Sequence, residues 1–493
     1  MSIGSGEGMK KPFIPRVTGP LLGIIAIMMA PSLIMAVALG EYAMIRAFAI
    51  PFGFTLAAGL PLTVTALRSL RKQPFRPRTR DGFLLVFLAW SLVSLAGAVP
   101  YCLSPQGLRF TDALFESTCA FTTTGGTGIA DIEALPRSLL FWRGMSHWFG
   151  AMGIVVLTVA LLPLLGVGGF QLIKAEAPGP EKEKITPKIT ATAKILWLVY
   201  SALTVLLTLL YLLGGMDWFD ALCHAFSTMA SGGVSTKNAG IAFFNSPFID
   251  IVTTVFMLLT ALNFNLYYRL IQGKFRDVLY NTEGRAYLII FFAAAAIITV
   301  SLVPVYGSVP VALRRASYQA ASILSTTGSA IADYEFWPVT AKAVLFGLMF
   351  IGGCSSSTAG GIKVIRHVVL FKQTGNELRR LLFPQGIFSV QLNRKVGRKD
   401  VVYGAAGFIF LYGMVIALTT LVVAASGTDL FSSFSAALSV TGNVGVGFGV
   451  VGPSGNYGAF PDYVKWFLSF VMIAGRLELW TVFVLFSPEF WRR

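Results

Sequence analysis

The fold is indicated most clearly by the segment Phe110-Thr-Asp-Ala-Leu-Phe-Glu-Ser-Thr-Cys-Ala-Phe-Thr-Thr-Thr-Gly125. It begins with an amphipathic segment too short to cross a membrane and ends in a cluster of threonine and glycine. Three later segments have the same form: Trp218-Phe-Asp-Ala-Leu-Cys-His-Ala-Phe-Ser-Thr-Met-Ala-Ser-Gly232, Ala316-Ser-Tyr-Gln-Ala-Ala-Ser-Ile-Leu-Ser-Thr-Thr-Gly328 and Leu430-Phe-Ser-Ser-Phe-Ser-Ala-Ala-Leu-Ser-Val-Thr-Gly442. Their final glycines are 107, 96 and 114 residues apart, so the sequence predicts four repeats of about one hundred residues.

Long apolar runs flank these four segments. A membrane span needs about 20 largely apolar residues, and the chain has ten such runs, at 19–40, 47–67, 82–102, 138–167, 193–213, 248–272, 285–306, 338–352 continuing to 382, 400–425 and 462–486. The residues are 55% hydrophobic and only 13% charged, whereas soluble domains are about 25% charged. We therefore exclude a soluble protein and predict an all-α membrane protein. The first run continues past Pro31, which favours a retained helix over a cleaved signal.

The basic residues indicate the orientation of the chain. The net charge is +16, from 39 Lys and Arg against 23 Asp and Glu. If the N-terminus is cytoplasmic, the segments on that side hold 29 of the 39 basic residues, which is the asymmetry of the positive-inside rule. We expect both termini in the cytoplasm. The basic excess is then a matter of topology and of contact with acidic lipids or a partner, and not of nucleic-acid binding.

The four Ser/Thr/Gly segments suit an ion pathway. Non-helical backbone at membrane depth is tolerated only where protein buries it or where it lines water. Glycine adopts dihedral angles that a β-carbon hinders, so four such loops on one axis can aim carbonyl oxygens inward, as in a potassium filter. No ring of carboxylates lies beside them, which disfavours a divalent-cation filter. The alternative, that small residues only allow close helix packing, does not explain four copies.

An enzyme is the rival class of function. The four cysteines and three histidines have no metal-ligand spacing, and Glu116, Asp217 and Asp220 stand singly near the starts of the short segments. The glycines at 445–449 lack the strand–turn–helix context of a dinucleotide site. We expect no enzymatic activity, no catalytic residue and no organic cofactor.

A second polar interruption divides the run at 338–382. Its small residues include Gly352, Gly353, Ser356, Gly360 and Gly361, and Lys363 follows them. Such a stretch cannot remain a straight helix and needs a wet or protein-lined site; a flexible kink is the alternative. No Gly-Lys-Ser/Thr follows, so it is not a phosphate-binding loop.

One arginine lies deep in the last apolar run. Arg476 stands two residues before Glu478. A charge at membrane depth is costly and usually faces a cavity or a partner. A purely structural pairing is the alternative to a role in a conduction path.

The repeats resemble the TrkH family, within the superfamily of potassium transporters built from four membrane–pore–membrane units. Trp148-Phe-Gly-Ala-Met-Gly-Ile-Val-Val-Leu157, Leu165-Gly-Val-Gly-Gly-Phe-Gln171, Ala175-Glu-Ala-Pro-Gly-Pro180 and Ile351-Gly-Gly-Cys-Ser-Ser-Ser-Thr-Ala-Gly-Gly-Ile-Lys363 are similar to that family at near-identity. The resemblance covers roughly residues 15–490. It implies four such units around one central pore, preceded by two N-terminal transmembrane helices.

The resemblance also implies roles for individual residues. The potassium filter would comprise Thr123, Thr124, Gly125, Ala230, Ser231, Gly232, Thr326, Thr327, Gly328, Val440, Thr441, Gly442 and Asn443. An intramembrane loop at 352–361 would gate the pore from beneath the filter, together with Lys363 and Arg476. Many family members carry asparagine where Gly442 is placed here, so this chain has glycine in all four loops, which the family associates with potassium preference. A serine at the position of Gly125 would mark sodium permeability.

The implied function is potassium uptake across the bacterial inner membrane, by a homodimer that docks a cytosolic TrkA-type nucleotide-binding ring on the basic segments near 174–194 and 363–399. A sodium-dependent KtrB-like transporter is the alternative, and channel or coupled symport stays open. The expected division of the chain is 1–80 for the N-terminal helices, then repeats at 81–174, 175–276, 277–382 and 383–493. The filter segments are expected near 122–128, 229–235, 325–330 and 440–447.

Overall fold

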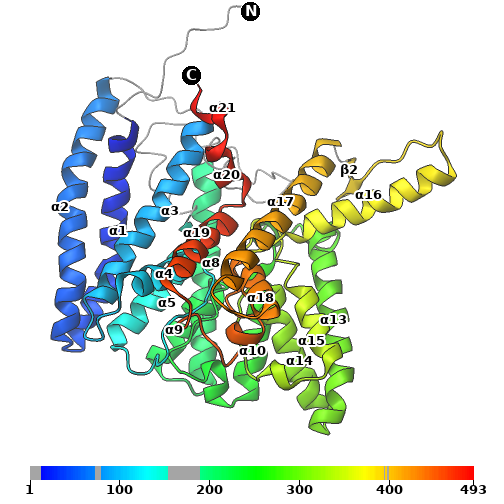
Figure 1. Cartoon of the computed structure of the whole chain (residues 1–493), viewed down its shortest axis with the longest axis horizontal. Coiled ribbons are helices and arrows are strands. Elements are labelled where there is room, and N and C mark those ends of the chain that lie inside the picture. Colours follow the sequence, from blue (N-terminus) through cyan, green and yellow to red (C-terminus); the bar gives the residue numbers. More distant parts are fainter. Residues whose placement is uncertain (1–12, 73–78, 154–188, 394, 397–398, 493) are drawn as a thin grey trace, which may run out of the picture.

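The computed structural model describes residues 13–72, 79–153, 189–393, 395–396 and 399–492, and most of them lie in helices (Figure 1). The β-structure among these residues is one antiparallel hairpin of β1 (Gln391–Leu392) and β2 (Lys395–Val396). The start of α1 and the end of the last helix lie at the same end of the molecule (Figure 1).

Two antiparallel helices, α1 (Phe13–Ala38) and α2 (Tyr42–Lys72), form a separate layer on one side of the molecule (Figure 1). Small residues allow them to approach closely. A β-carbon on Gly19 would lie 2.5 Å from the backbone nitrogen of Thr63, and one on Gly59 would lie 3.1 Å from the Gly19 carbonyl oxygen. Close approach of this kind is the usual way in which membrane helices pack.

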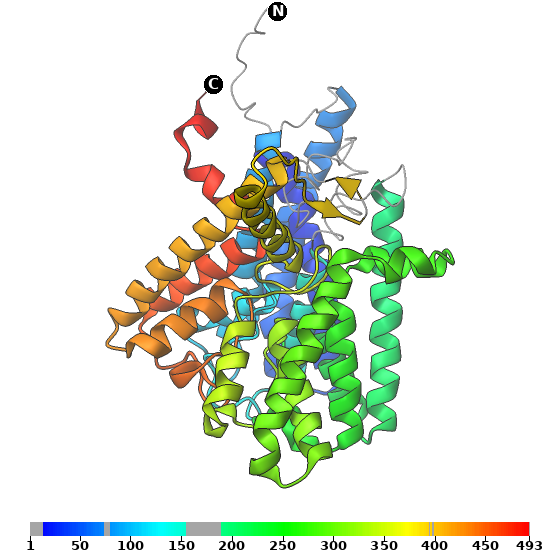
Figure 2. The same ribbon diagram turned by 90° about the vertical axis from the view of Figure 1, so that its right-hand side faces the viewer.

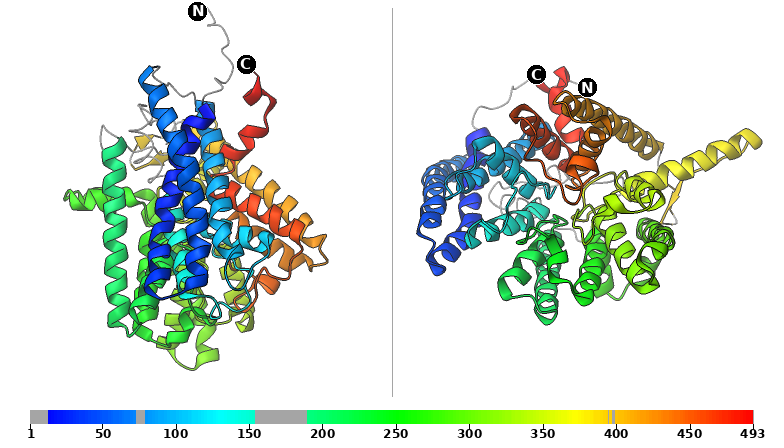
Figure 3. Two further views of the ribbon diagram at one scale, coloured as in Figure 1. Left: turned by 90° about the vertical axis from the view of Figure 1, so that its left-hand side faces the viewer. Right: turned by 60° about the horizontal axis from the view of Figure 1, so that its bottom comes forward.

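The rest of the chain forms four units, each with a long helix, a short helix and a third helix. They are α3 (Thr79–Cys102), α4 (Phe110–Phe121) and α5 (Arg137–Ala151); α8 (Ile189–Leu213), α9 (Trp218–Met229) and α10 (Pro247–Ala261); α13 (Thr282–Tyr306), α14 (Val309–Leu324) and α15 (Val339–Leu348); and α17 (Lys399–Ala424), α18 (Leu430–Thr441) and α19 (Asp462–Arg476). The right-hand view of Figure 3 shows the units arranged around a common centre.

Side-chain caps start several of these helices abruptly after a loop. The Asp217 carboxylate accepts a hydrogen bond from the Asp220 N–H (2.6 Å), and Asp429 accepts one from the Ser432 N–H (2.9 Å). Each bond satisfies a donor that the first turn of the helix leaves without a partner. The short helices α9 and α18 therefore begin at fixed positions.

Six of the described helices are long and apolar enough to cross a membrane, and two bent pairs raise the number to as many as eight. The six coincide with the predicted runs at 19–40, 47–67, 82–102, 193–213, 285–306 and 400–425. The run at 248–272 is bent by 93° between α10 and α11 (Phe264–Ile271), and the run at 462–486 is bent by 109° after α19. The second half of the run at 138–167 lies outside the described residues.

The predicted run at 338–382 is not one helix. It consists of α15, an irregular loop and α16 (Val364–Leu382), which projects from the side of the molecule (Figures 1 and 2). The remaining elements are short: α12 (Phe275–Leu279), α20 (Trp480–Phe483), α21 (Pro488–Trp491), η1 (Gly240–Phe244), η2 (Tyr334–Phe336), η3 (Gly449–Val451) and η4 (Val484–Phe486).

Replacing Gly19 with alanine tests the close approach of α1 and α2. The new methyl group would meet the α2 backbone, which cannot move aside easily, so we expect a loss of about 1–3 kcal/mol in the free energy of unfolding. Gly53→Ala is the matched control, because a β-carbon there has no neighbour within 4 Å. Thermal unfolding in detergent measures both variants, and equal stability of the two would contradict this packing.

Candidate functional site

The four short helices end in the same run of backbone conformations. The residue directly after the helix end has helical angles, and the next one has a positive φ of 53° to 57°. Two positions further comes a glycine with a φ of 62° to 84°. The four residues of the first kind are Thr123, Ser231, Thr326 and Asn443, and the glycines are Gly125, Gly233, Gly328 and Gly445. We call residues 122–126, 230–234, 325–329 and 442–446 the pore segments.

This geometry corrects the predicted register of two segments. The sequence repeat pairs Gly232 and Gly442 with Gly125 and Gly328, but Gly233 and Gly445 have the matching positive φ. In the fourth segment α18 continues through Thr441, whose hydroxyl bonds to the Ala437 carbonyl (2.7 Å). Val440 and Thr441 therefore belong to the short helix, and Gly442 and Ala230 occupy the position directly after it. Gly233, Val444 and Gly445 lie within the predicted filter segments 229–235 and 440–447 but were not among the individually named residues.

The four pore segments touch one another in a closed ring. A β-carbon on Gly125 would lie 2.0 Å from the carbonyl oxygen of Gly232, in the next repeat. The same relation, at 1.9 to 2.0 Å, joins Gly233 to Thr327, Gly328 to Val444 and Gly445 back to Thr124. Real β-carbons do not approach an oxygen so closely, so each of these positions requires glycine. The ring also fixes the order of the repeats around the centre.

Side chains of the pore segments bond to one another behind the ring. The hydroxyls of Thr122 and Thr124 share a hydrogen bond (2.8 Å), and those of Ser325 and Thr327 share another (2.7 Å) in the third repeat. The Asn443 amide donates to the Thr124 hydroxyl (2.9 Å), which joins the fourth repeat to the first. These bonds hold the backbone of the ring in place.

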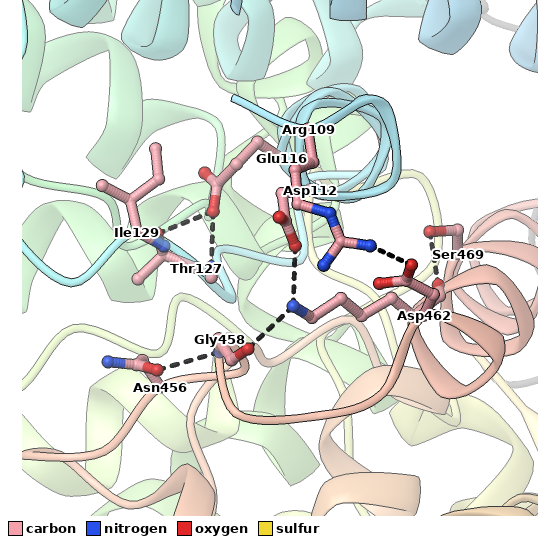
Figure 4. A network of polar contacts seen from close by, with 11 residues as sticks. Arg109, Asp112, Glu116, Thr127, Ile129, Asn456, Gly458, Asp462 and Ser469 are labelled. Carbon is pink, nitrogen blue, oxygen red and sulfur yellow. Dashed lines mark hydrogen bonds and ion pairs between the residues drawn. The ribbon is translucent and has the colours of Figure 1, made fainter. Parts of the chain in front are cut away.

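A buried carboxylate braces the first pore segment (Figure 4). Glu116 on α4 accepts hydrogen bonds from the Thr127 hydroxyl (2.7 Å) and the Gly128 N–H (2.5 Å). Arg143 on α5 lies 3.3 Å from Glu116 and also donates to the Ser235 carbonyl in the second repeat. The side chains of this ion pair are only 2–3% exposed. The pair therefore holds the segment after the first glycine against the second repeat.

Further ion pairs join neighbouring repeats. Lys465 on α19 donates to the Asp112 carboxylate on α4 (2.6 Å) and to the Gly458 carbonyl (2.8 Å). On the opposite side of the ring Asp250 on α10 pairs with Arg314 on α14 (3.5 Å). Each pair links the third helix of one repeat to the short helix of the next, so side-chain charge reinforces the ring.

A funnel of about 480 Å³ leads to the ring from one side, and all four glycines line it. Arg143, Lys237 and Asp333 are the charged residues of its lining. At its rim the Asn238 amide donates to the Asp131 carboxylate (2.9 Å) and so lowers the pKa of Asp131.

A polar loop at 352–361 lies against the pore segments. The Thr358 hydroxyl bonds to the Ser231 hydroxyl (2.9 Å), and the Gly360 N–H donates to the Thr326 hydroxyl (2.7 Å). A β-carbon on Gly360 would also lie 2.5 Å from the Gly442 carbonyl oxygen. The loop thus contacts three of the four pore segments, at their positive-φ residues or directly beside them.

The backbone of this loop is hydrogen-bonded to the surrounding protein. The Gly352 N–H donates to the Ile362 carbonyl (2.9 Å) and closes the loop at its base. The Cys354 N–H donates to the Ala261 carbonyl (2.8 Å). This carbonyl is available to the loop because Ala261 is the last residue of α10. Positive φ angles occur at Ser356 (55°) and Gly361 (71°), and Gly353 leaves no room for a β-carbon, which would lie 2.5 Å from that of Ala359.

Two cationic side chains lie beside the loop. Arg476 donates to the Thr358 carbonyl (2.7 Å) and to the Ala151 carbonyl at the end of α5 (3.2 Å). Lys363 is buried, and its ammonium group donates to the Ala359 carbonyl. Glu478, which stands two residues after Arg476 in the sequence, forms an ion pair with Arg366.

Four short helices whose ends form a ring at the centre of a bundle of apolar helices define the class of membrane ion-pathway proteins with four pore repeats. The family model for TrkH, described as a cation transport protein, matches residues 54–493, and the chain belongs to that family. This confirms the predicted fold class.

Individual proteins are similar over nearly the whole chain. The Trk system potassium uptake protein TrkH of Escherichia coli (strain K12) is 40% identical over 91% of this chain and 92% of its own length. The protein of the same name from Halomonas elongata is 39% identical over 98% of this chain and all of its own. The crystal structure of the potassium transporter TrkH from Vibrio parahaemolyticus superimposes with a TM-score of 0.86 at 35% identity, over 98% of this chain and 100% of that one.

Replacing Arg143 with methionine tests the buried brace. The variant leaves the Glu116 carboxylate buried without its cation, and we expect a loss of about 3–5 kcal/mol in the free energy of unfolding. The double variant with Glu116→Gln should recover part of it. The exposed pair of Arg109 and Asp462 supplies the control, because Arg109→Met should cost less than about 1 kcal/mol. A small effect of Arg143→Met would show that the brace is dispensable.

Proposed function

We propose that this chain carries potassium ions across the bacterial inner membrane as the membrane subunit of a Trk-type system. The closed ring of four pore segments is the observation that carries the proposal. The similar proteins from Escherichia coli and Halomonas elongata, both called potassium uptake proteins, support it. The proposed function involves no enzymatic activity of this chain and no organic cofactor.

The filter consists of the pore segments, with the register found in the structure. Backbone oxygens of Thr124, Gly232, Thr327 and Val444 replace the hydration shell of the ion at the level of the ring. These oxygens are uncharged, which suits a monovalent cation that must bind and then leave. Positive φ at the four ring glycines supports this assignment, since it lets the chain alternate in direction without steric cost.

The loop at 352–361 is the gate. It lies against three pore segments, and none of its residues lines the funnel, so we place it across the path on the other side of the ring. Arg476 places a positive charge on the Thr358 carbonyl of this loop, where it opposes the passage of a cation. Lys363 adds a second positive charge at the base of the loop.

The charge distribution and the family support a proposal for the topology and the partners. Both termini lie in the cytoplasm, and two copies form a homodimer in the lipid bilayer. A TrkA-type cytosolic ring docks on the basic segments near 174–194 and 363–399. The proposed division is 1–80 for the N-terminal helices and 81–174, 175–276, 277–382 and 383–493 for the repeats. The relatives named above are Trk system proteins, and no specific observation favours the KtrB-like alternative.

Replacing Gly125 with serine tests the filter and the function together. Purified protein in liposomes should take up rubidium and exclude sodium, and an imposed proton gradient shows whether uptake is coupled. In Gly125→Ser the side chain is forced against the Gly232 carbonyl oxygen, so we expect the preference for rubidium over sodium to fall about tenfold, or about 1.4 kcal/mol. Gly347→Ser is the control, since a β-carbon there has no neighbour within 4 Å. A variant that still excludes sodium would contradict the filter assignment.

Replacing Arg476 with alanine tests the gate. Loss of the charge and of its bond to Thr358 should raise rubidium uptake about tenfold and leave the ratio of rubidium to sodium unchanged. Arg379→Ala, on the exposed side of α16, should change neither quantity. Unchanged uptake in Arg476→Ala would count against the role of this arginine as a barrier.

A further inference from the structure

The hairpin after α16 returns to the first turn of α13. The Asn393 N–H donates to the Thr282 hydroxyl (3.0 Å), and the Thr282 N–H donates to the Asn393 side-chain oxygen (2.8 Å). Asn393 has a φ of 47°, a conformation that asparagine tolerates better than most residues. Two reciprocal bonds between residues 111 positions apart therefore hold the hairpin on the start of a membrane-spanning helix.

The next residue of α13 holds the polar loop. Glu283 is only 5% exposed. One of its carboxylate oxygens accepts hydrogen bonds from the Ser355 N–H (2.7 Å), the Ser355 hydroxyl (3.1 Å) and the Ile365 N–H (3.2 Å). Ser355 lies near the beginning of the loop and Ile365 lies just after its end. A single charged acceptor thus joins both ends, and bonds to a charged group are stronger than those between neutral groups.

The polar loop and the hairpin are also connected directly, through α16. The loop is followed by α16, whose residues Ile365 and Val369 share a buried cluster with Val390, just before β1, and Leu392, within β1. The Lys372 ammonium group also donates to the Gln391 carbonyl (2.7 Å). The hairpin is therefore connected to the loop twice, along α16 and through Thr282 and Glu283.

We propose that the hairpin is a latch on the gate, and that Thr282 and Glu283 are the positioning residues through which it acts. While Asn393 is bonded to Thr282, the start of α13 keeps Glu283 on both ends of the loop, and the loop stays against the pore segments. Release of the hairpin frees the start of α13, weakens the hold on the loop and raises ion flux. The inference rests on the proposed role of the loop as the gate. It requires that the latched and released states differ in how well they retain the loop.

Three variants of the full chain, reconstituted in liposomes, test the latch by rubidium uptake. Asn393→Gly removes the side-chain acceptor and keeps a residue that adopts positive φ. Thr282→Val removes the hydroxyl acceptor, whereas Thr282→Ser keeps it and serves as the matched control. We expect Asn393→Gly and Thr282→Val to raise uptake about twofold to tenfold, the range for loss of one hydrogen bond. Thr282→Ser should equal the parent protein.

A double-variant cycle with Glu283→Gln distinguishes a latch from a general loss of structure. Glu283→Gln keeps the shape and removes the charge, and it should raise uptake by itself. If the hairpin acts through Glu283, adding Asn393→Gly to that variant should give no further increase. The rubidium-to-sodium ratio and the unfolding temperature of the single hairpin variants should stay at the parent values, which a merely destabilised protein would not show.

Two results would overturn the latch. The first is that the hairpin variants take up rubidium at the parental rate while Arg476→Ala takes it up faster. The gate would then be working, and the hairpin would not control it. Fully additive effects of Asn393→Gly and Glu283→Gln would show that the hairpin does not act through the carboxylate. If the parent protein itself takes up no rubidium, the proposed function fails instead, and that result is distinct from the other two.

Discussion

Four close approaches between backbone atoms support the rest of this structure. Each ring glycine brings its Cα so near to a carbonyl oxygen of the following repeat that a β-carbon would lie within 1.9 to 2.0 Å of that oxygen. The relation runs from repeat one to two, three, four and back to one, so the ring closes only if all four short helices end at the same depth. The caps that start α9 and α18, the buried Glu116–Arg143 pair and the charge pairs between repeats all serve to place those helix ends.

The membrane imposes the second constraint, because backbone polar groups at that depth need partners within the protein. The polar loop meets this need by using groups that broken helices leave available. The end of α10 supplies the Ala261 carbonyl, Glu283 supplies a carboxylate, and the pore segments supply the hydroxyls of Ser231 and Thr326. The bend after α19 brings Arg476 to the Thr358 carbonyl. Some apolar runs are thus long enough for one continuous helix but are interrupted. The interruptions provide the groups that bond to the polar loop.

Apolar length and repetition were enough to predict the helical bundle, the four pore repeats and six of the spans, because burial in lipid leaves a direct mark on composition. The polar interruption before Lys363 was predicted from its small residues, but the two bends were not, since hydrogen bonding to distant segments contributes to them. The register of the second and fourth pore segments was wrong because each segment holds two nearby glycines, Gly232 and Gly233 in one and Gly442 and Gly445 in the other. Only the backbone angles show which glycine of each pair matches Gly125 and Gly328. Glu283 was missed altogether, since its partner Ser355 is 72 residues away.

We propose that the carbonyl ring of the four pore segments binds the transported ion. Anomalous diffraction from crystals of this protein grown in rubidium tests it most directly, because rubidium mimics potassium and its position is seen independently of the protein density. We expect an anomalous peak on the central axis, within coordination distance of the carbonyl oxygens of Thr124, Gly232, Thr327 and Val444. A rubidium peak confined to the funnel, with none at the level of the ring, would contradict it.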